Sequence, residues 1–353
     1  MDPQLDAPPA AHSWLGPPID ARPLFVPEHA ALIATLRELT PADWEREAVP
    51  GWSVRDVAAH VLADCYGRLA RHRDGQGEGG AGSAPGGAPG KGRRGAPGRE
   101  PGGGPGGAPG RGPRGVQGGG GPGGGPGGPV FAPGEDLPAY IHRINQQWVD
   151  AHSRVSPAAL TDTLELIGGQ VARLFAESDP AAPSLGVSWA GADPAPMWLD
   201  SARELTEYWT HRRQIRHAAG QGTDPDPRLL SVVLDTFLRA LPHTLRDTTA
   251  PAGTQVRIHV TGPAGGTWTA TAGGTWTATA SGTSTGTAPD GGNWSLAGPA
   301  ADGHPAALVR LDAETAWRLC VRGIEPADAL TRAEIEGDRQ LAEAACRIVS
   351  VVH

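Results

Sequence analysis

The spacing of apolar residues along about the first 220 positions predicts a series of helices. Apolar side chains recur there at intervals of three and four residues, which places them on one face of an α-helix. In the fourth of these stretches, we expect a break at Gly168 and Gly169. The stretches cover residues 27–39, 54–73, 137–153, 157–177 and 196–219. Four long helices and one further helical segment predict a helical bundle.

The helix expected from residue 54 has a complete start signal. Gly51 breaks the chain, and Ser53 is a favourable N-cap residue. Asp56 follows three positions later and completes the pattern of a capping box. Trp52 before the cap and Val57 after it match the two positions of a hydrophobic staple. This signal is the strongest local prediction in the chain.

The pattern changes after residue 222. Residues 254–261 alternate between apolar and polar side chains, which is typical of a half-buried strand. The sequence Gly-Gly-Thr-Trp-Thr-Ala-Thr-Ala occurs twice in tandem, at 265–272 and 273–280, and favours a hairpin because Thr and Trp favour strands. Further strands are expected at 293–296, 307–311 and 333–336, and helices at 228–241, after Asp312 and after Asp338. The second half is therefore predicted to be a small α+β domain.

Residues 75–134 interrupt the helical pattern with glycine and proline. They hold 29 of the 52 glycines and 11 of the 35 prolines. Such a stretch cannot bury enough apolar surface to offset the entropy of ordering, so we expect a disordered insertion. The expected organisation is a flexible tail at 1–25, a bundle at 26–222 that contains the insertion, and an α+β domain at 223–353. The predicted fold class of the whole chain is α+β.

Charge and cysteine content argue against several classes of protein. The formal net charge is −8, which disfavours a general nucleic-acid binder. The beginning of the chain lacks the basic and apolar regions of a signal peptide, and no apolar run approaches the roughly 20 residues of a membrane span. Cys65, Cys320 and Cys346 form neither a disulfide framework nor a paired metal motif. These features predict a cytoplasmic protein without a nucleic-acid or membrane partner.

His60, Glu207 and His211 are the candidate chemical residues. Glu207 and His211 are four positions apart on one expected helix, so their side chains share a face. Helical spacing places all three residues away from the apolar stripes, which suits a polar cleft and equally suits a solvated face with an ordinary ion pair. As ligands, two His and one Glu leave an open position, as in catalytic zinc sites. Iron, nickel and cobalt accept the same donor types.

Two stretches resemble signatures of one known family. Residues 50–62, Pro-Gly-Trp-Ser-Val-Arg-Asp-Val-Ala-Ala-His-Val-Leu, are similar to the PGWSVRDVVAHL signature of the mycothiol-dependent maleylpyruvate isomerase family, an actinobacterial group of DinB-like bundles. Residues 207–216 resemble its second signature, E-x-x-x-H-x-x-D-I-R. The resemblance covers about residues 26–74 and 135–353. It implies a DinB-like four-helix bundle followed by the small α+β domain.

The resemblance also implies a chemistry. It implies that His60, Glu207 and His211 ligate a divalent metal, with zinc as the first choice, and that mycothiol is the thiol cosubstrate. A thiolate can add to an activated cis double bond and leave after rotation, which gives the trans isomer, and the same thiolate could serve thiol transfer. The implied substrate is a small unsaturated dicarboxylate of the maleylpyruvate type. Gln214 stands where the family often has Asp, which changes the hydrogen bonding around the ligands.

A dicarboxylate substrate needs a positively charged side chain to bind it. Arg322 is the candidate for binding a substrate carboxylate. Cys65, by contrast, is expected to be a buried structural thiol. The other arginines considered for the carboxylate are Arg212, Arg213, Arg216 and Arg318.

Two alternatives to an isomerase remain. A non-catalytic, metal-dependent binding or regulatory module would bind metal without thiol-dependent turnover. A hydrolase using a zinc-bound water would act without added thiol.

Overall fold

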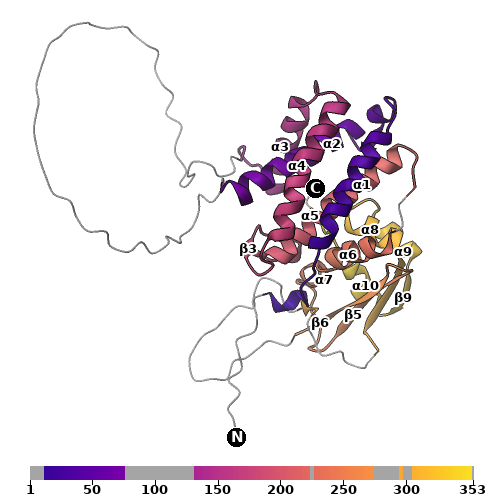
Figure 1. Ribbon diagram of the computed structural model, residues 1–353. Coiled ribbons are helices and arrows are strands. Elements are labelled where there is room, and N and C mark those ends of the chain that lie inside the picture. Colours follow the sequence, from indigo (N-terminus) through magenta and orange to yellow (C-terminus); the bar gives the residue numbers. More distant parts are fainter. Residues whose placement is uncertain (1–11, 76–130, 223–225, 274–293, 297–303, 352–353) are drawn as a thin grey trace, which may run out of the picture.

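The structure is a computed structural model that describes residues 12–75, 131–222, 226–273, 294–296 and 304–351. It contains helices and a mixed β-sheet, which agrees with the predicted α+β class (Figure 1). Residues 76–130 of the expected insertion, nearly all of the second tandem copy and the first residues of the expected tail lie outside the described ranges. Of the helices within those ranges, none combines the length and the apolarity needed to cross a bilayer.

The first half of the described chain, here called the helical half, is a group of packed helices. α1 and α2 each pack against both α4 and α5, and α3 packs against α2 (Figure 1). Phe25 of α1 stacks on Phe175 of α4 with ring centroids 4.9 Å apart, deep in the interior. A π-helical segment, Leu69–Arg73, extends α2. The helices are α1 (Phe25–Glu38), α2 (Val54–Arg68), α3 (Leu137–Ala151), α4 (Pro157–Glu177) and α5 (Met197–Ala218).

Short elements join these helices. Two antiparallel pairs of very short strands flank α2 and α5: β1 with β2 lies before α2, and β3 with β4 lies before α5. The strands are β1 (Glu47–Val49), β2 (Trp52–Ser53), β3 (Pro183–Ser184) and β4 (Ala195–Pro196). The 3-10 helices are η1 (Ser13–Leu15), η2 (Arg22–Leu24), η3 (Asp43–Glu45) and η5 (Ser188–Ala190).

The start of α2 has the predicted capping box. The Ser53 hydroxyl accepts a hydrogen bond from the backbone N–H of Asp56, and the Asp56 carboxylate accepts one from the backbone N–H of Ser53. Gly51 has a φ of 82°, which a residue with a side chain rarely adopts, and it turns the chain between β1 and β2. The cap therefore fixes the position of His60 in the second turn of α2.

α4 is a continuous helix, so the expected break at Gly168 and Gly169 is wrong. A Cβ atom on Gly168 would lie 2.6 Å from Nε2 of His29, a residue of α1. The same Nε2 donates a hydrogen bond to the carbonyl oxygen of Leu164 at 3.1 Å. Gly168 therefore makes room for a neighbouring helix and does not interrupt its own.

The second half of the described chain, the sheet half, contains a five-stranded sheet in the order β7-β6-β5-β8-β9. β5 and β8 are parallel, and the other neighbouring strands are antiparallel. Ile258 of β5 lies opposite Trp268 of β6 and Val309 of β8, and α8 and α10 pack against β5 and β8. The strands expected at 254–261 and in the first tandem copy are present and pair as a hairpin of β5 and β6, whereas a hairpin between the two copies would involve residues outside the described ranges. The strands are β5 (Gln255–Thr261), β6 (Gly266–Ala272), β7 (Trp294–Ser295), β8 (Ala307–Asp312) and β9 (Glu334–Gly337).

The helices of the sheet half follow the sequence prediction with two differences. The single helix expected at 228–241 is divided into α6 and α7, and α9 was not anticipated. Asp312 caps α8 by accepting from Thr315 N–H, and Asp338 caps α10 by accepting from Leu341 N–H, as predicted. The helices are α6 (Pro227–Leu238), α7 (Leu241–Thr244), α8 (Ala313–Cys320), α9 (Pro326–Arg332) and α10 (Arg339–Ala345).

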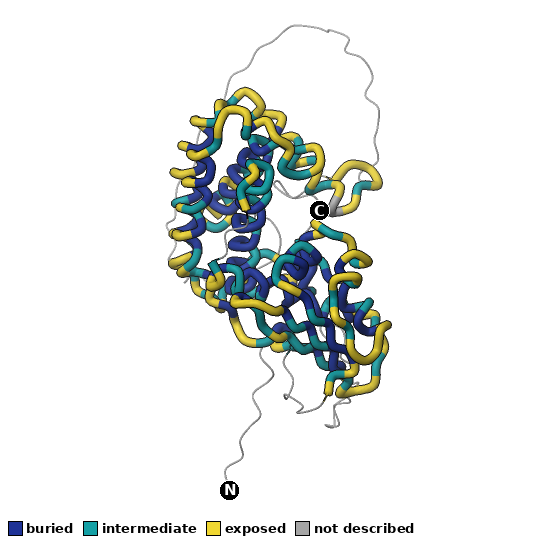
Figure 2. The backbone as a smooth tube through the Cα atoms, turned by 90° about the vertical axis from the view of Figure 1, so that its right-hand side faces the viewer, coloured by how far each residue is buried: buried dark blue, intermediate teal, exposed yellow. Residues whose placement is uncertain are grey.

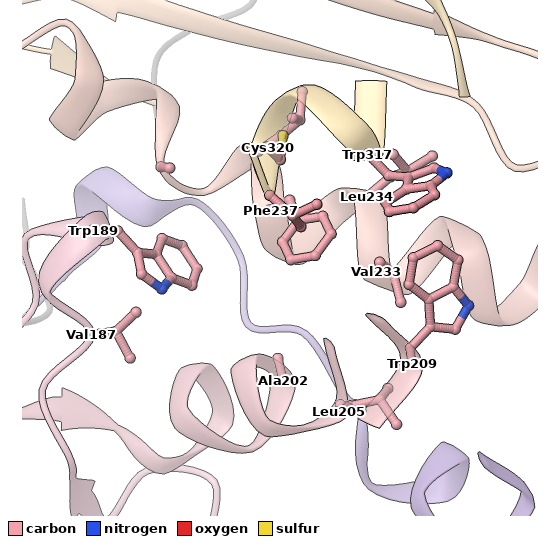
Figure 3. Packing of buried hydrophobic residues seen from close by; sticks show 14 of the residues in the cluster. Val187, Trp189, Ala202, Leu205, Trp209, Val233, Leu234, Phe237, Trp317 and Cys320 are labelled. Atoms are coloured by element: carbon pink, nitrogen blue, oxygen red, sulfur yellow. The ribbon is translucent and has the colours of Figure 1, made fainter. Parts of the chain in front are cut away.

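The two halves share one apolar cluster, shown in Figure 3. Trp209 of α5 meets Trp317 of α8 edge to face, with ring centroids 5.3 Å apart and planes at 87°. Val233 and Leu234 of α6 lie in the same cluster (Figure 3). α5, which carries Glu207 and His211, is therefore packed against both halves of the molecule.

Candidate metal centre

His60, Glu207 and His211 meet between α2 and α5. The ring centroids of His60 and His211 are 4.9 Å apart, and their planes are nearly perpendicular at 84°. Oε2 of Glu207 lies 3.6 Å from Nε2 of His211, one helical turn along α5. The fold thus brings together all three candidate ligands, although they come from distant parts of the sequence.

Two neighbouring side chains orient the imidazoles. Oε1 of Gln214 lies 2.8 Å from Nδ1 of His211. Because an amide oxygen accepts a hydrogen bond, Nδ1 carries the proton and Nε2 keeps its lone pair. A carboxylate hydrogen-bonded to Nδ1 produces the same tautomer in many histidines that ligate metals. Trp52, expected only as a staple, places its ring 5.1 Å from that of His60 and donates from Nε1 to Oε1 of Gln146 in α3 at 2.9 Å. Gln214 and Trp52 therefore belong to the site.

Burial and neighbouring charge control protonation at these residues. Burial, followed by the nearby His211, lowers the pKa of His60 from 6.5 to about 3, so its imidazole is neutral at pH 7. Burial opposes ionisation of Glu207, but the neighbouring His211, 3.6 Å away, and His60 hold the pKa of Glu207 below its ordinary value. The group therefore offers a neutral imidazole and a carboxylate, which are the forms that bind metal ions.

Two buried imidazole nitrogens without hydrogen-bond partners indicate that these residues could bind a metal ion. Nδ1 of His60 and Nε2 of His211 are buried and have no hydrogen-bond partner. A buried polar atom without a partner is costly, and a metal ion would satisfy both nitrogens. Among the described residues, however, no three or more His, Cys, Asp or Glu side chains form a group ready to hold a metal ion. The donor set thus fits a metal chemically, while the ligand atoms are not in place as a finished coordination shell.

A second polar group lies farther along the same two helices, and sequence reasoning missed it. Arg68 of α2 donates from Nη1 to both carboxylate oxygens of Asp200 at 3.0 Å, and its Nη2 lies 2.7 Å from Oε2 of Glu204. Arg203 reaches Asp200 at 2.8 Å, and Asp64 lies 3.9 Å from Arg68. We call these five residues the charged cluster. The available signal was the recurrence of charge at helical spacing, at positions 60, 64 and 68 and at 200, 204, 207 and 211.

Glu204 shows that the charged cluster lacks positive charge. Burial raises the pKa of Glu204 well above its ordinary value, and Asp64 and Glu207 raise it further against the opposing effect of Arg68. Both carboxylate oxygens of Glu204 are buried without a hydrogen bond of good geometry, although Arg68 is close in distance. A carboxylate that is buried and incompletely paired is what a nearby cation would stabilise.

The arginines considered for a substrate carboxylate have other contacts. Arg322, the assigned one, lies just beyond α8 with a φ of 58°, is exposed, and donates to the carbonyl oxygen of Arg347 at 3.4 Å. This contact joins it to the C-terminal part of the chain, and its role towards a substrate stays a prediction. Arg212 pairs with Glu28 at 2.6 Å, Arg213 lies over the ring of Trp209, Arg216 donates to the Gly222 carbonyl, and Arg318 pairs with Glu314 at 2.6 Å.

The three cysteines are all buried and free. Sγ of Cys65 lies 3.2 Å from the hydroxyl of Tyr208, and burial raises the pKa of the Cys65 thiol well above its ordinary value. Burial likewise raises the pKa of Cys320 and of Cys346 to about 12. Thiols of this kind stay protonated and inert at neutral pH. Cys65 therefore has the expected structural role, and a reactive thiolate would have to come from outside the chain.

Comparison with known proteins identifies the N-terminal part of the chain. Residues 25–100 match the family model described as the mycothiol maleylpyruvate isomerase N-terminal domain. The matched stretch includes α1, α2 and His60, and it confirms the family resemblance. Glu207 and His211 lie beyond it. No curated protein and no solved structure matches the chain.

Proposed function

We propose that this protein is a mycothiol-dependent enzyme of the maleylpyruvate isomerase type. The match of residues 25–100 to the N-terminal domain of the mycothiol maleylpyruvate isomerase family supports this proposal. In this proposal His60, Glu207 and His211 hold a divalent metal ion, with zinc as the first choice. The observation that carries it is the meeting of two imidazoles and a carboxylate between α2 and α5. A metal bound there would supply a Lewis acid that holds a thiol as its thiolate.

The charge around the site supports a divalent ion. Glu207 and the charged cluster together contain four carboxyl groups and two guanidinium groups, so their formal charge is −2 when all are ionised. The raised pKa of Glu204 is the response of a buried group to this shortage of positive charge. One divalent cation at His60, Glu207 and His211 would remove the formal deficit.

The chain's own residues have distinct roles in this proposal. His211 presents Nε2 because Nδ1 donates its hydrogen bond to Oε1 of Gln214. Trp52 covers His60 and limits the access of water from its side. The proposed scaffold is the four-helix bundle of the DinB type, formed by α1, α2, α4 and α5. The proposed setting is the cytoplasm, where thiols such as the three buried cysteines stay reduced.

The reaction needs an external thiol and a substrate with an activated cis double bond. The sulfur of mycothiol adds to the double bond, rotation occurs about the resulting single bond, and loss of the thiolate restores the double bond as trans. Atoms and electrons balance without an oxidant, because the thiol is recovered. The proposed substrate class is an unsaturated dicarboxylate, and Arg322 stays the candidate for one carboxylate.

The proposal is tested by measuring cis–trans isomerisation of maleylpyruvate with zinc-loaded protein, with and without mycothiol. We expect turnover only when both metal and thiol are present. His60→Ala and Glu207→Gln should lower kcat/KM by at least about 100-fold, since each removes a ligand. The matched control is His259→Ala, because His259 lies on β5 in the sheet half and its side chain is hydrogen-bonded to Thr267 of the neighbouring strand β6. Its kcat/KM should stay within about twofold of the wild type.

Other outcomes would identify the rival functions. Turnover of an ester or amide without any thiol would contradict the isomerase and favour a hydrolase that uses a metal-bound water. Metal binding without turnover of any thiol-dependent substrate would favour a binding or regulatory module. Equal activity in the wild type and in His60→Ala would exclude the proposed site.

A further inference from the structure

α2 and α5 carry polar residues that face each other in consecutive levels. His60 meets Glu207 and His211, Asp64 interacts with Glu204, and Arg68 pairs with Asp200 and Glu204. The residue numbers rise along α2 while those of their partners fall along α5, so the two helices run antiparallel. The candidate ligands and the charged cluster therefore form one continuous polar seam between the same two helices.

Arg68 is the most firmly held member of this seam. Its side chain is 4% exposed, and those of Asp200 and Glu204 are 0% exposed. The guanidinium reaches both oxygens of Asp200 at 3.0 Å and Oε2 of Glu204 at 2.7 Å. Asp200 is fixed in turn by the Ser184 hydroxyl at 2.6 Å and by Arg203 at 2.8 Å. Arg68 therefore connects α2 to two successive turns of α5.

Stability alone does not explain this arrangement. A buried ion pair can often be replaced by apolar residues of similar volume without loss of stability, because desolvation of the charges offsets their attraction. What an apolar seam does not provide is a unique register, since apolar side chains can pack after a shift of one turn. A shift of about 5.4 Å, one helical turn, would move His60 from the level of Glu207 to that of Glu204 or beyond His211. The pairing of Arg68 with Asp200 and Glu204 excludes such a shift.

We propose that Arg68 is a positioning residue, which holds α2 and α5 in the one register that brings His60 opposite Glu207 and His211. This inference rests on the proposed function, because it concerns the same metal site. Arg68 lies two turns away from His60 along α2 and acts only through the relative position of the helices. Its geometry matters as well as its charge, because a planar guanidinium can reach Asp200 and Glu204 together, whereas an ammonium group is a point charge on a flexible chain.

The test compares two conservative substitutions in the full-length chain, Arg68→Lys and Arg212→Lys. Arg212 is a matched control because it is also a buried arginine, with a side chain 3% exposed, and forms an ion pair with a fully buried carboxylate, Glu28. Its pair with Glu28 joins α5 to α1. Both substitutions keep the charge and lose the guanidinium, so both should lower the thermal midpoint to a similar extent. Zinc affinity is measured by competition with a chelator, at a temperature well below both midpoints.

We expect Arg68→Lys to weaken zinc binding about tenfold to 100-fold, the usual effect of a disturbed residue behind the ligands, and Arg212→Lys to change it less than about threefold. Cobalt(II) provides a second readout, because its visible absorption reports ligand geometry and not stability. The cobalt spectrum should change in Arg68→Lys and stay like the wild type in Arg212→Lys.

Three results would overturn the inference, and they separate it from the proposed function. Wild-type zinc affinity and cobalt spectrum in Arg68→Lys would refute the positioning role while leaving the metal site intact. Equal loss of affinity in both variants would show that Arg68 acts only through general stability. Failure of the wild type itself to bind zinc or cobalt would overturn the proposed function, and the inference with it.

Discussion

The seam between α2 and α5 and the sheet of the second half both have buried centres, but these contain opposite kinds of side chain. Val256 and Ile258 of β5 and Val309 of β8 are at most 1% exposed and purely apolar. The charged pair of Arg310 and Glu336 lies at the surface of that sheet. In the helical half, whose buried segments are dark blue in Figure 2, Arg68, Asp200 and Glu204 are buried charged residues, and the candidate ligands beside them are half-buried.

The difference separates a region whose burial favours folding from a region whose burial is costly. Burial of apolar side chains is favourable by about 25 cal/mol per Å² removed from water, so the sheet core contributes directly to folding. Burial of charge is costly and is repaid only when every group is paired. The seam contains unpartnered nitrogens on His60 and His211 and incompletely paired oxygens on Glu204. We infer that this cost is retained because the site needs those groups.

The largest expected effect is on the paired charges of the seam. Arg68→Met should lower the free energy of unfolding by about 3–5 kcal/mol, because Asp200 and Glu204 would remain buried without their partner. The matched surface substitution, Arg310→Met, removes an exposed pair and should cost at most about 1 kcal/mol. Urea unfolding of both variants and the wild type measures the difference. Equal losses in the two variants would remove the contrast between seam and sheet.

A smaller effect is expected from pH, through His60 in the metal-free protein. Its pKa in the folded state is about 3, compared with 6.5 in an unfolded chain. Between these values the unfolded chain binds a proton that the folded chain excludes, so the free energy of unfolding falls as pH falls below about 6.5. From pH 7 to pH 5, this residue should account for a loss of about 2 kcal/mol.

The measurement is urea unfolding of the metal-free wild type and of His60→Gln at both pH values. His60→Gln should lose about 2 kcal/mol less than the wild type over this range, because glutamine does not titrate. His259→Gln, in the sheet half, is the control and should follow the wild type. An identical pH dependence in all three proteins would mean that His60 is not held neutral by burial.

The smallest expected effect is that of a substitution in the apolar core of the sheet. Ile258→Val removes one methylene group from the sheet core and should cost about 0.5–1.5 kcal/mol. Zinc affinity should not change, because Ile258 lies in the sheet half, between Trp268 and Val309 of the neighbouring strands. Urea unfolding and chelator competition measure the two quantities on the same protein. A parallel loss of zinc affinity would show that the site responds to general stability.

Local signals in the sequence predicted local features well. The capping box at Ser53, the caps at Asp312 and Asp338 and the alternation in β5 depend on neighbours a few residues away, and the structure has all of them. Gly168 failed as a signal because its role depends on His29, a residue of another helix. α9 was missed because its seven residues are too few to show a periodic pattern.

The sequence pointed to the three candidate residues, whose role as ligands stays a prediction, but it did not show their surroundings. Helical spacing placed His60, Glu207 and His211 off the apolar stripes, which left a solvated face and a cleft equally acceptable. The structure adds that the polar face of α2 meets the polar face of α5, and no periodicity within one helix carries that information. The same limit hid Arg68, whose partners Asp200 and Glu204 are more than 130 positions away along the chain.

The proposed function requires that His60, Glu207 and His211 bind one metal ion. It is tested most directly by mass spectrometry of the metal content of the wild type, His60→Ala and His211→Ala, with His259→Ala as control. We expect about one equivalent of a transition metal in the wild type and in the control, and its loss in both ligand variants. A wild type that binds no metal even after zinc is supplied, or ligand variants that retain a full equivalent, would contradict it.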